Sequence, residues 1–237
     1  MRNILTIARR EVKAYFASWM AYATIAGFIV ISSYIFFVIL TQNKQDVRLQ
    51  WVFSNMAVTF LFMTPLITMR LLAEEKNTGT IELLLTAPVT DWQVVLGKYF
   101  GALSVFIAIF ALTLIYPLTI EHYANPDRGP ILAGYLGILL VVCCYVSVGL
   151  FSSSVTDSQV VAGFMGFGIL LGFWIVHWVS SSLNNFWGEF LKTIAIVPHL
   201  EDYTEGLVDT KHLVYQLSFI FFWLYCSVRI LESRKWR

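Results

Sequence analysis

Four histidines are the first candidates for chemistry in this sequence, because imidazole can bind a metal or move a proton near neutral pH. They are His122, His177, His199 and His212, and none lies in a metal-binding spacing such as H-E-x-x-H. We therefore expect interfacial or hydrogen-bonded histidines. The sequence predicts neither a metal site nor a catalytic histidine.

Three consecutive serines, Ser152 to Ser154, offer hydroxyl groups for nucleophilic catalysis. The segment lacks the G-x-S-x-G spacing that places a nucleophilic serine on a sharp turn. It is also predicted at the opposite membrane face from His177, which leaves it without a base at its depth. An embedded enzyme using Ser152 and His177 is the weakest interpretation, and we predict no enzyme activity.

The sequence offers no phosphate-binding loop for ATP. In the single Gly-Lys pair, Gly97-Lys98, Tyr99 follows where a P-loop has Ser or Thr, and Trp92 stands in place of the first glycine. The long apolar runs contain no Asp, Glu, Lys or Arg, which disfavours ion-driven transport because charges in a bilayer mark ion pathways. We expect no cofactor on this chain, so its energy must come from elsewhere.

The elements around these groups are predicted to be membrane spans. Of the 237 residues, 58% are hydrophobic and 13% charged, against about 45–50% and about 25% in a soluble domain. A bilayer needs about 20 apolar residues per helix. We predict one all-α domain, residues 1–237, with spans at about 19–40, 51–72, 99–120, 131–151, 160–179 and 212–231. The net charge of +1 gives no indication of a nucleic-acid partner.

Basic residues predict the orientation of the spans. With six spans both termini share one side, which holds 11 of the 16 Lys and Arg residues. The positive-inside rule therefore puts both termini in the cytoplasm. Residues 1–18 have apolar and basic residues at helical spacing and predict a helix in the membrane interface; a cytoplasmic extension of the first span is the alternative.

Two further segments are predicted to shape the bundle. Gly163, Gly168 and Gly172 leave a flat stripe on the fifth span, which favours close helix packing over a ligand groove. Residues 180–211 form an extracytoplasmic loop. Its apolar stretch at 186–197 is too short to span and predicts an amphipathic or re-entrant helix at the outer leaflet.

The most informative segment is the cytoplasmic loop, residues 73–98. Acids at 74, 75 and 82 flank the turn Thr78-Gly79-Thr80, leucines follow at 83–85, and a second helix is expected from Asp91, a natural N-cap. Anionic lipid headgroups would repel the acids. We therefore predict a helical hairpin that docks on another protein.

The motif E-E-K-x-x-G-T-I-E-L-L-L-T-x-P-V, with G-K further on, resembles the ABC-2 type permeases, and most closely the gliding-motility, GldF-like branch. The segment S-S-S-V-T-D-S-Q-V-V-A and the ending L-E-S-R-K-W-R extend the resemblance over nearly the whole chain. The resemblance implies a type V exporter-like fold. It also implies that the loop contacts an ATPase subunit through Glu74, Glu75, Thr78, Gly79, Thr80, Glu82 and Leu83, with a smaller loop contributing Ser153, Thr156 and Gln159.

The resemblance implies the following function and partners. The chain would be the permease subunit of an ABC transporter in the bacterial inner membrane. It would pair with a second permease protomer, and an ABC ATPase subunit that binds ATP and Mg²⁺ would drive export. The alternative is a membrane scaffold that recruits the ATPase to drive an extracytoplasmic partner, such as a GldG-like protein, without moving cargo.

Overall fold

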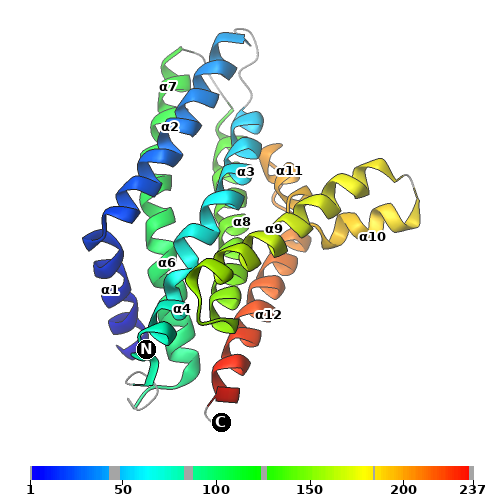
Figure 1. The fold of residues 1–237 in the computed structure, drawn as a ribbon. Coiled ribbons are helices and arrows are strands. Elements are labelled where there is room, and N and C mark those ends of the chain that lie inside the picture. The colour runs from blue at the N-terminus through cyan, green and yellow to red at the C-terminus, as the bar shows by residue number, and fades with distance from the viewer. Residues whose placement is uncertain (1, 43–48, 83–87, 124–126, 184, 235–237) are drawn as a thin grey trace.

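The computed structural model describes residues 2–42, 49–82, 88–123, 127–183 and 185–234. Within these ranges nearly every residue is helical and none forms a strand (Figure 1). The helices are α1 Arg2–Ala17, α2 Trp19–Gln42, α3 Leu49–Thr68, α4 Arg70–Asn77, α6 Asp91–Thr113, α7 Ile115–Tyr123, α8 Arg128–Val155, α9 Gln159–Ser182, α10 Phe186–Ile194, α11 Pro198–Thr204 and α12 Thr210–Arg234.

Six helical stretches among the described residues are long and apolar enough to cross a bilayer. They are Trp19–Thr41, Gln50–Asn77, Asp91–Glu121, Arg128–Val155, Gln159–Ser182 and Thr210–Ser233. The second combines α3 with α4, and the third combines α6 with α7. This confirms the predicted all-α architecture with six membrane-spanning helices.

The segment predicted as a loop at 73–98 is largely helical. Helix α4 continues the second span as far as Asn77, and α6 begins at Asp91, the residue from which the sequence predicts a second helix, and continues into the third span. Thr90, not Asp91, is the N-cap. Its hydroxyl accepts from the Gln93 amide at 3.4 Å, and the Gln93 side chain accepts from the Thr90 amide at 3.3 Å. This capping box satisfies amides at the helix start and sets where α6 begins.

Helices α3 and α8 form the centre of the bundle. Within their apolar windows 61% of the residues are buried, against 17% for α2 and 22% for α9, so the latter two lie at the edge. Phe60 of α3 stacks on Phe28 of α2 at 4.3 Å and meets Phe106 of α6 edge-on at 5.7 Å between ring centroids. Phenylalanine rings therefore fill the space among α2, α3 and α6.

Glycine packing occurs at a different place from the predicted stripe. A Cβ added to Gly149 of α8 would lie 2.1 Å from the Thr68 hydroxyl, so α8 and α3 touch there only because the side chain is absent. Within α9, a Cβ on Gly163 would reach only Met69, and a Cβ on Gly168 or Gly172 would have nothing within 4 Å. The α9 stripe lies at the edge of the bundle, and its close packing stays a prediction for contact with another chain.

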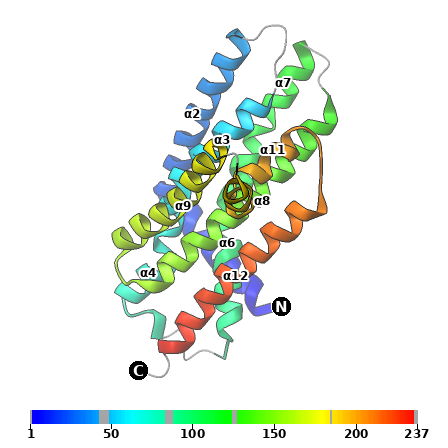
Figure 2. The same cartoon turned by 90° about the vertical axis from the view of Figure 1, so that its right-hand side faces the viewer.

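Helix α1 begins and α12 ends at the same end, where the turn between α4 and α6 also lies (Figure 1). The chain turns at Ser18, whose amide bonds the Tyr15 carbonyl at 3.0 Å, and α1 runs across the direction of α12 (Figure 2). Helix α1 is therefore separate from α2 and is not a straight extension of the first span.

The short helix predicted within 186–197 is α10. Helix α9 packs on α8 and α3, and its C-terminal part lies beside α10 and projects with it away from the other helices (Figure 1). Helix α11 returns the chain to the bundle, where it packs on α8 and leads into α12.

Candidate functional site

The hairpin turn after α4 is closed by its own threonines. Gly79 has φ +72°, a left-handed conformation that glycine adopts without strain at a helix C-terminus. The Thr78 hydroxyl donates to the Glu74 carbonyl at 2.9 Å and lies 2.9 Å from the Thr80 hydroxyl. The sequence Thr-Gly-Thr therefore ends the helix and reverses the chain locally.

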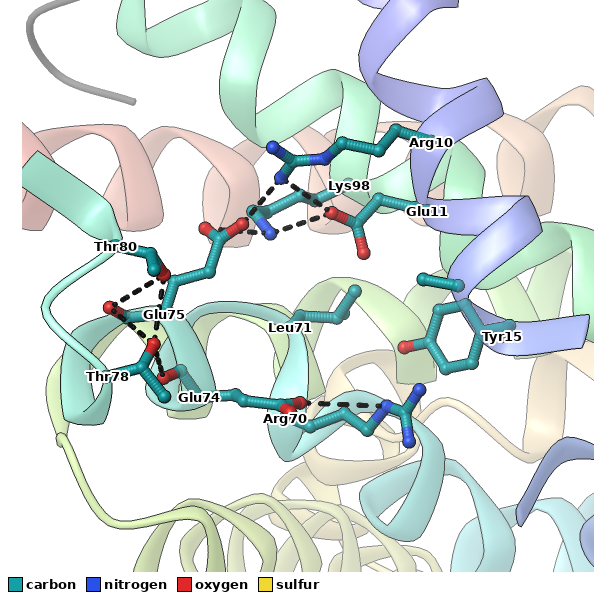
Figure 3. Close-up of a pocket in the computed structure, with 11 residues that line it drawn as sticks. Arg10, Glu11, Tyr15, Arg70, Leu71, Glu74, Glu75, Thr78, Thr80 and Lys98 are labelled. Carbon is teal, nitrogen blue, oxygen red and sulfur yellow. Dashed lines mark hydrogen bonds and ion pairs between the residues drawn. The ribbon is translucent and has the colours of Figure 1, made fainter. Parts of the chain in front are cut away.

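Four charged side chains meet behind this turn (Figure 3). The Lys98 ammonium of α6 lies 3.0 Å from a Glu11 carboxylate oxygen of α1 and 2.9 Å from a Glu75 oxygen of α4. Arg10 of α1 adds contacts of 2.6 Å to Glu75 and 3.3 Å to Glu11. We call these four residues the charged bracket; it joins α1, α4 and α6.

Burial makes the charged bracket more than a set of surface pairs. The Lys98 side chain is 1% exposed, and those of Glu11 and Glu75 are 13% and 16% exposed. A charge removed from water is costly unless partners surround it, and here two carboxylates share one ammonium. The bracket therefore fixes the three helices in one arrangement, since separating any of them would expose or orphan a charge.

A second set of contacts joins α1 to the end of α3 and the start of α4. The Tyr15 hydroxyl donates to the Ile67 carbonyl at 2.8 Å, and the Arg70 guanidinium lies 4.9 Å from the centre of the Tyr15 ring. Burial raises the pKa of Tyr15 well above its usual value, so it stays a neutral donor. Arg70 also lies 4.0 Å from Glu74, one turn along α4.

The connection between α8 and α9 is attached to α4 from the other side. Ser153 Oγ accepts from the Leu72 and Ala73 amides at 2.8 and 2.9 Å and donates to the Met69 carbonyl at 3.1 Å. It thus satisfies backbone groups at the break between α3 and α4. The buried Lys76 ammonium donates to the Ser154 carbonyl and lies 3.9 Å from Asp157.

The structure divides the predicted contact residues into two groups. Those with outward-facing side chains or an exposed backbone are Glu74, Thr78, Gly79, Thr80 and Glu82. Glu75 instead points into the charged bracket, and Ser153 is fully buried against α4. Thr156 and Gln159 are half-buried at the α8–α9 connection, and Leu83 lies outside the described residues.

Sequence reasoning missed the inner half of the site. In the sequence, Lys98 stands out only as part of the Gly97-Lys98 pair, and nothing singles out Arg10, Glu11 or Lys76 as its neighbours. A lysine inside an otherwise apolar α6 segment, V-V-L-G-K-Y-F, was the available signal, because a buried lysine requires an acidic partner. Nothing local indicated that the partners would come from α1 and α4.

The bracket also forms one wall of a cleft of about 330 Å³. The labelled side chains converge on the cleft from α1, α4, the turn after α4 and α6 (Figure 3). The rest of its lining is Ala14, Tyr15, Arg70, Leu71, Glu74, Thr78 and Thr80. The lining carries three acids and three bases, so the cleft has no strong net charge.

The chain is similar in sequence to known proteins. Residues 5–186 match the family model described as ABC-2 family transporter protein. The chain is also 28% identical over 144 residues to a protein described as a probable multidrug ABC transporter permease, YbhR, from Escherichia coli strain K12, and equally to YbhR from strain O157:H7.

These matches differ in extent. The alignment to YbhR covers 60% of this chain and 39% of that protein, so the chain spans about two fifths of the relative. The family model covers about three quarters of this chain, including the whole hairpin and the α8–α9 connection. Together with the six membrane-spanning helices, this places the chain in the ABC-2 family, the permeases of ABC transporters.

Proposed function

We propose that this chain is the transmembrane permease subunit of an ABC transporter and that a separate ATPase subunit drives export through it. Family membership implies an ATPase partner. The observation that supports coupling at the hairpin is its two-sided construction. One face is exposed and acidic, and the other is fastened to α1, α6 and α8 by buried polar contacts.

The exposed face would bind the ATPase. Glu74 and Glu82 present carboxylates on either side of the Thr78–Thr80 turn. Carboxylates and hydroxyls accept hydrogen bonds, so the complementary surface would carry arginine or lysine. Leu83 stays a predicted member of this contact.

The fastened face would carry motion into the membrane. If the ATPase displaced the turn, α4 would move with it, and the charged bracket would move α1 and the start of α6. Ser153 and Lys76 would transmit the displacement to the end of α8. An ATPase that binds the two arrangements with different affinity would shift the equilibrium between them.

The substrate path would lie between two permease protomers. The rings of Phe28, Phe60 and Phe106 close the space among α2, α3 and α6. Gly168 and Gly172 of the largely exposed α9 leave a surface on which a second helix could approach closely. The second protomer would be a copy of this chain or a homologue.

The proposal also includes the orientation of this chain in the membrane and the subunit that binds the nucleotide. The excess of basic residues supports cytoplasmic termini in a bacterial inner membrane, which would put the hairpin beside a cytoplasmic ATPase. ATP and Mg²⁺ would be bound by that ATPase, and the permease would contribute no catalytic residue.

The phenylalanine-filled interior favours a second candidate function. The chain would then anchor the ATPase and transmit its motion to an extracytoplasmic partner, such as a GldG-like protein, without moving cargo. A closed interior within one chain fits this candidate. It ranks second because a closed interior within one chain is compatible with a path between two chains, and the matching family is described as transporter proteins.

Paired substitutions test the proposed coupling. Glu74→Ala with Glu82→Ala should greatly reduce the amount of ABC ATPase, identified by its Walker-motif peptides, that co-purifies from the native membrane. Glu75→Gln should retain the ATPase but uncouple ATP hydrolysis from transport, because it disturbs the charged bracket and leaves the docking face intact. Glu205→Ala, an exposed acid in the loop between α11 and α12, is the matched control. Undiminished ATPase recovery with the double variant would contradict the proposal.

A further inference from the structure

Two histidines at the end of α12 away from the C-terminus form a buried pair. His199 Nδ1 of α11 lies 2.6 Å from His212 Nδ1 of α12, and the residues are 4% and 8% exposed. His212 Nε2 lies 2.5 Å from an Asp202 carboxylate oxygen, and His199 Nε2 lies 3.2 Å from the Thr193 carbonyl oxygen of α10. This chain of contacts joins α10, α11 and α12.

The partners of the outer nitrogens fix where protons must be. A carbonyl oxygen only accepts, so His199 Nε2 carries a hydrogen. An ionised Asp202 also only accepts, so His212 Nε2 carries one as well. Each ring is therefore already protonated on the nitrogen that faces away from the other ring.

The 2.6 Å contact between the two Nδ1 atoms then requires one more proton. Two bare nitrogens would oppose their lone pairs, and two N–H groups would oppose their hydrogens. Three protons on two imidazoles give the pair one positive charge, which Asp202 balances. If a proton moves from His212 to Asp202, the tautomers change, but the two rings and Asp202 together still hold three protons.

The other charged groups around the pair are balanced in number. The pair and Asp202 border a cleft of about 410 Å³ that also contains Glu189 and Lys192 of α10 and Lys211 of α12. Asp209, just before α12, supplies a second acid, so these bases and acids number two each. The aromatic neighbours are Tyr215, stacked on His199 at 4.2 Å, and Tyr203, whose ring centre lies 6.0 Å from that of His212.

We propose that His199, His212 and Asp202 form a proton-binding site, in which one shared proton latches α11 to α12. Burial lowers the pKa of His199, which favours the neutral form of that ring. The latch is independent of the ATPase and lies in a different part of the molecule from the hairpin. Its ligand is the proton itself.

Proton counting gives the pH response. With ordinary pKa values of about 6.5 for His and about 3.9 for Asp, the opened site holds four protons between pH ~4 and ~6.5 and two above ~6.5. The closed site holds three. Closure therefore strengthens as pH rises to about 6.5 and weakens above it, by about tenfold in the opening equilibrium per pH unit on each side.

The weakening above pH ~6.5 distinguishes the shared proton from an ordinary buried histidine. A buried neutral histidine loses stability only on the acid side, where the opened state takes up a proton. A site that needs an extra proton when closed also loses stability on the alkaline side.

Hydrogen exchange of the full-length protein in lipid nanodiscs tests this between pH 5 and 8, with rates corrected for the intrinsic pH dependence. Amides of α11 and the first turn of α12 should be most protected near pH 6.5 and lose about tenfold in protection per unit above it. Amides of α8 at residues 141–150, in the core, should show no such maximum. His212→Gln should abolish the alkaline loss, whereas Glu205→Gln should retain it.

Protection in wild-type protein that stays constant or rises from pH 6.5 to 8 would overturn the proposal. So would an alkaline loss that persists unchanged in His212→Gln. If that variant does not fold, the wild-type profile beside that of Glu205→Gln still decides the question.

Discussion

At the scale of single residues, the site depends on side chains whose neighbours in sequence behave differently. Glu74 faces outward and Glu75 inward, although both are acids on the same short helix. Ser152 donates to the Val148 carbonyl of its own helix, whereas Ser153 bridges to α4. Residue type alone therefore does not distinguish residues that would contact a partner from residues that hold the helices together. Single substitutions can make this distinction.

Lys98→Met should strongly destabilise the protein. The substitution leaves the mostly buried Glu11 and Glu75 with the half-exposed Arg10 as their remaining counter-charge within the charged bracket. Breaking a buried pair costs about 3 kcal/mol. Thermal unfolding in nanodiscs should show a clear drop in midpoint. Lys13→Met, which removes an exposed lysine from α1, should leave the midpoint nearly unchanged. Equal midpoints for the two variants would show that the charged bracket contributes no stability.

Ser153→Ala should weaken the junction between α3 and α4. It removes the acceptor of two buried backbone amides, and each unsatisfied donor costs about 1–3 kcal/mol. Hydrogen exchange at Leu72 and Ala73 should accelerate accordingly. Ser152→Ala is the matched control, because the Ser152 hydroxyl donates to the Val148 carbonyl within α8. Similar exchange rates in both variants would contradict the bridging role.

At the scale of elements, the hairpin is built from local signals at both ends. The Thr90–Gln93 capping box begins α6, and the Thr78-Gly79-Thr80 turn ends α4. Helix caps and turns depend on residues a few positions apart, so these features could be predicted from the sequence. The position of α1 on α6 could not, because it rests on contacts between residues nearly 90 positions apart.

Gly79→Val should fray the end of α4, because a β-branched residue at φ +72° is strained even where space is open. The amides of Thr78 and Gly79, which bond α4 carbonyls, should exchange faster. Gly79→Asn should be tolerated, since asparagine adopts this conformation at lower cost. If valine and asparagine behave alike, the left-handed conformation is not needed for the turn.

At the scale of the whole molecule, orientation across the membrane determines which end meets the ATPase. Single cysteines at Glu82 and Glu205, in a chain whose three native cysteines are replaced, should respond oppositely to a membrane-impermeant maleimide. We expect labelling of Glu205→Cys in intact cells and of Glu82→Cys only after permeabilisation. The reverse result would place the hairpin outside the cell and refute ATPase coupling through it.

The sequence by itself determined the six spans, the all-α class and the family, because a bilayer requires long apolar helices with locally satisfied backbones. It also located the hairpin, whose turn is a local structure. Only the tertiary structure decided which way each polar group points. Successive helical residues are rotated by about 100°, so the packing of α1 and α6 sets the roles of Glu74 and Glu75. The packing of α11 on α12 likewise brings together His199 and His212, which are 13 positions apart.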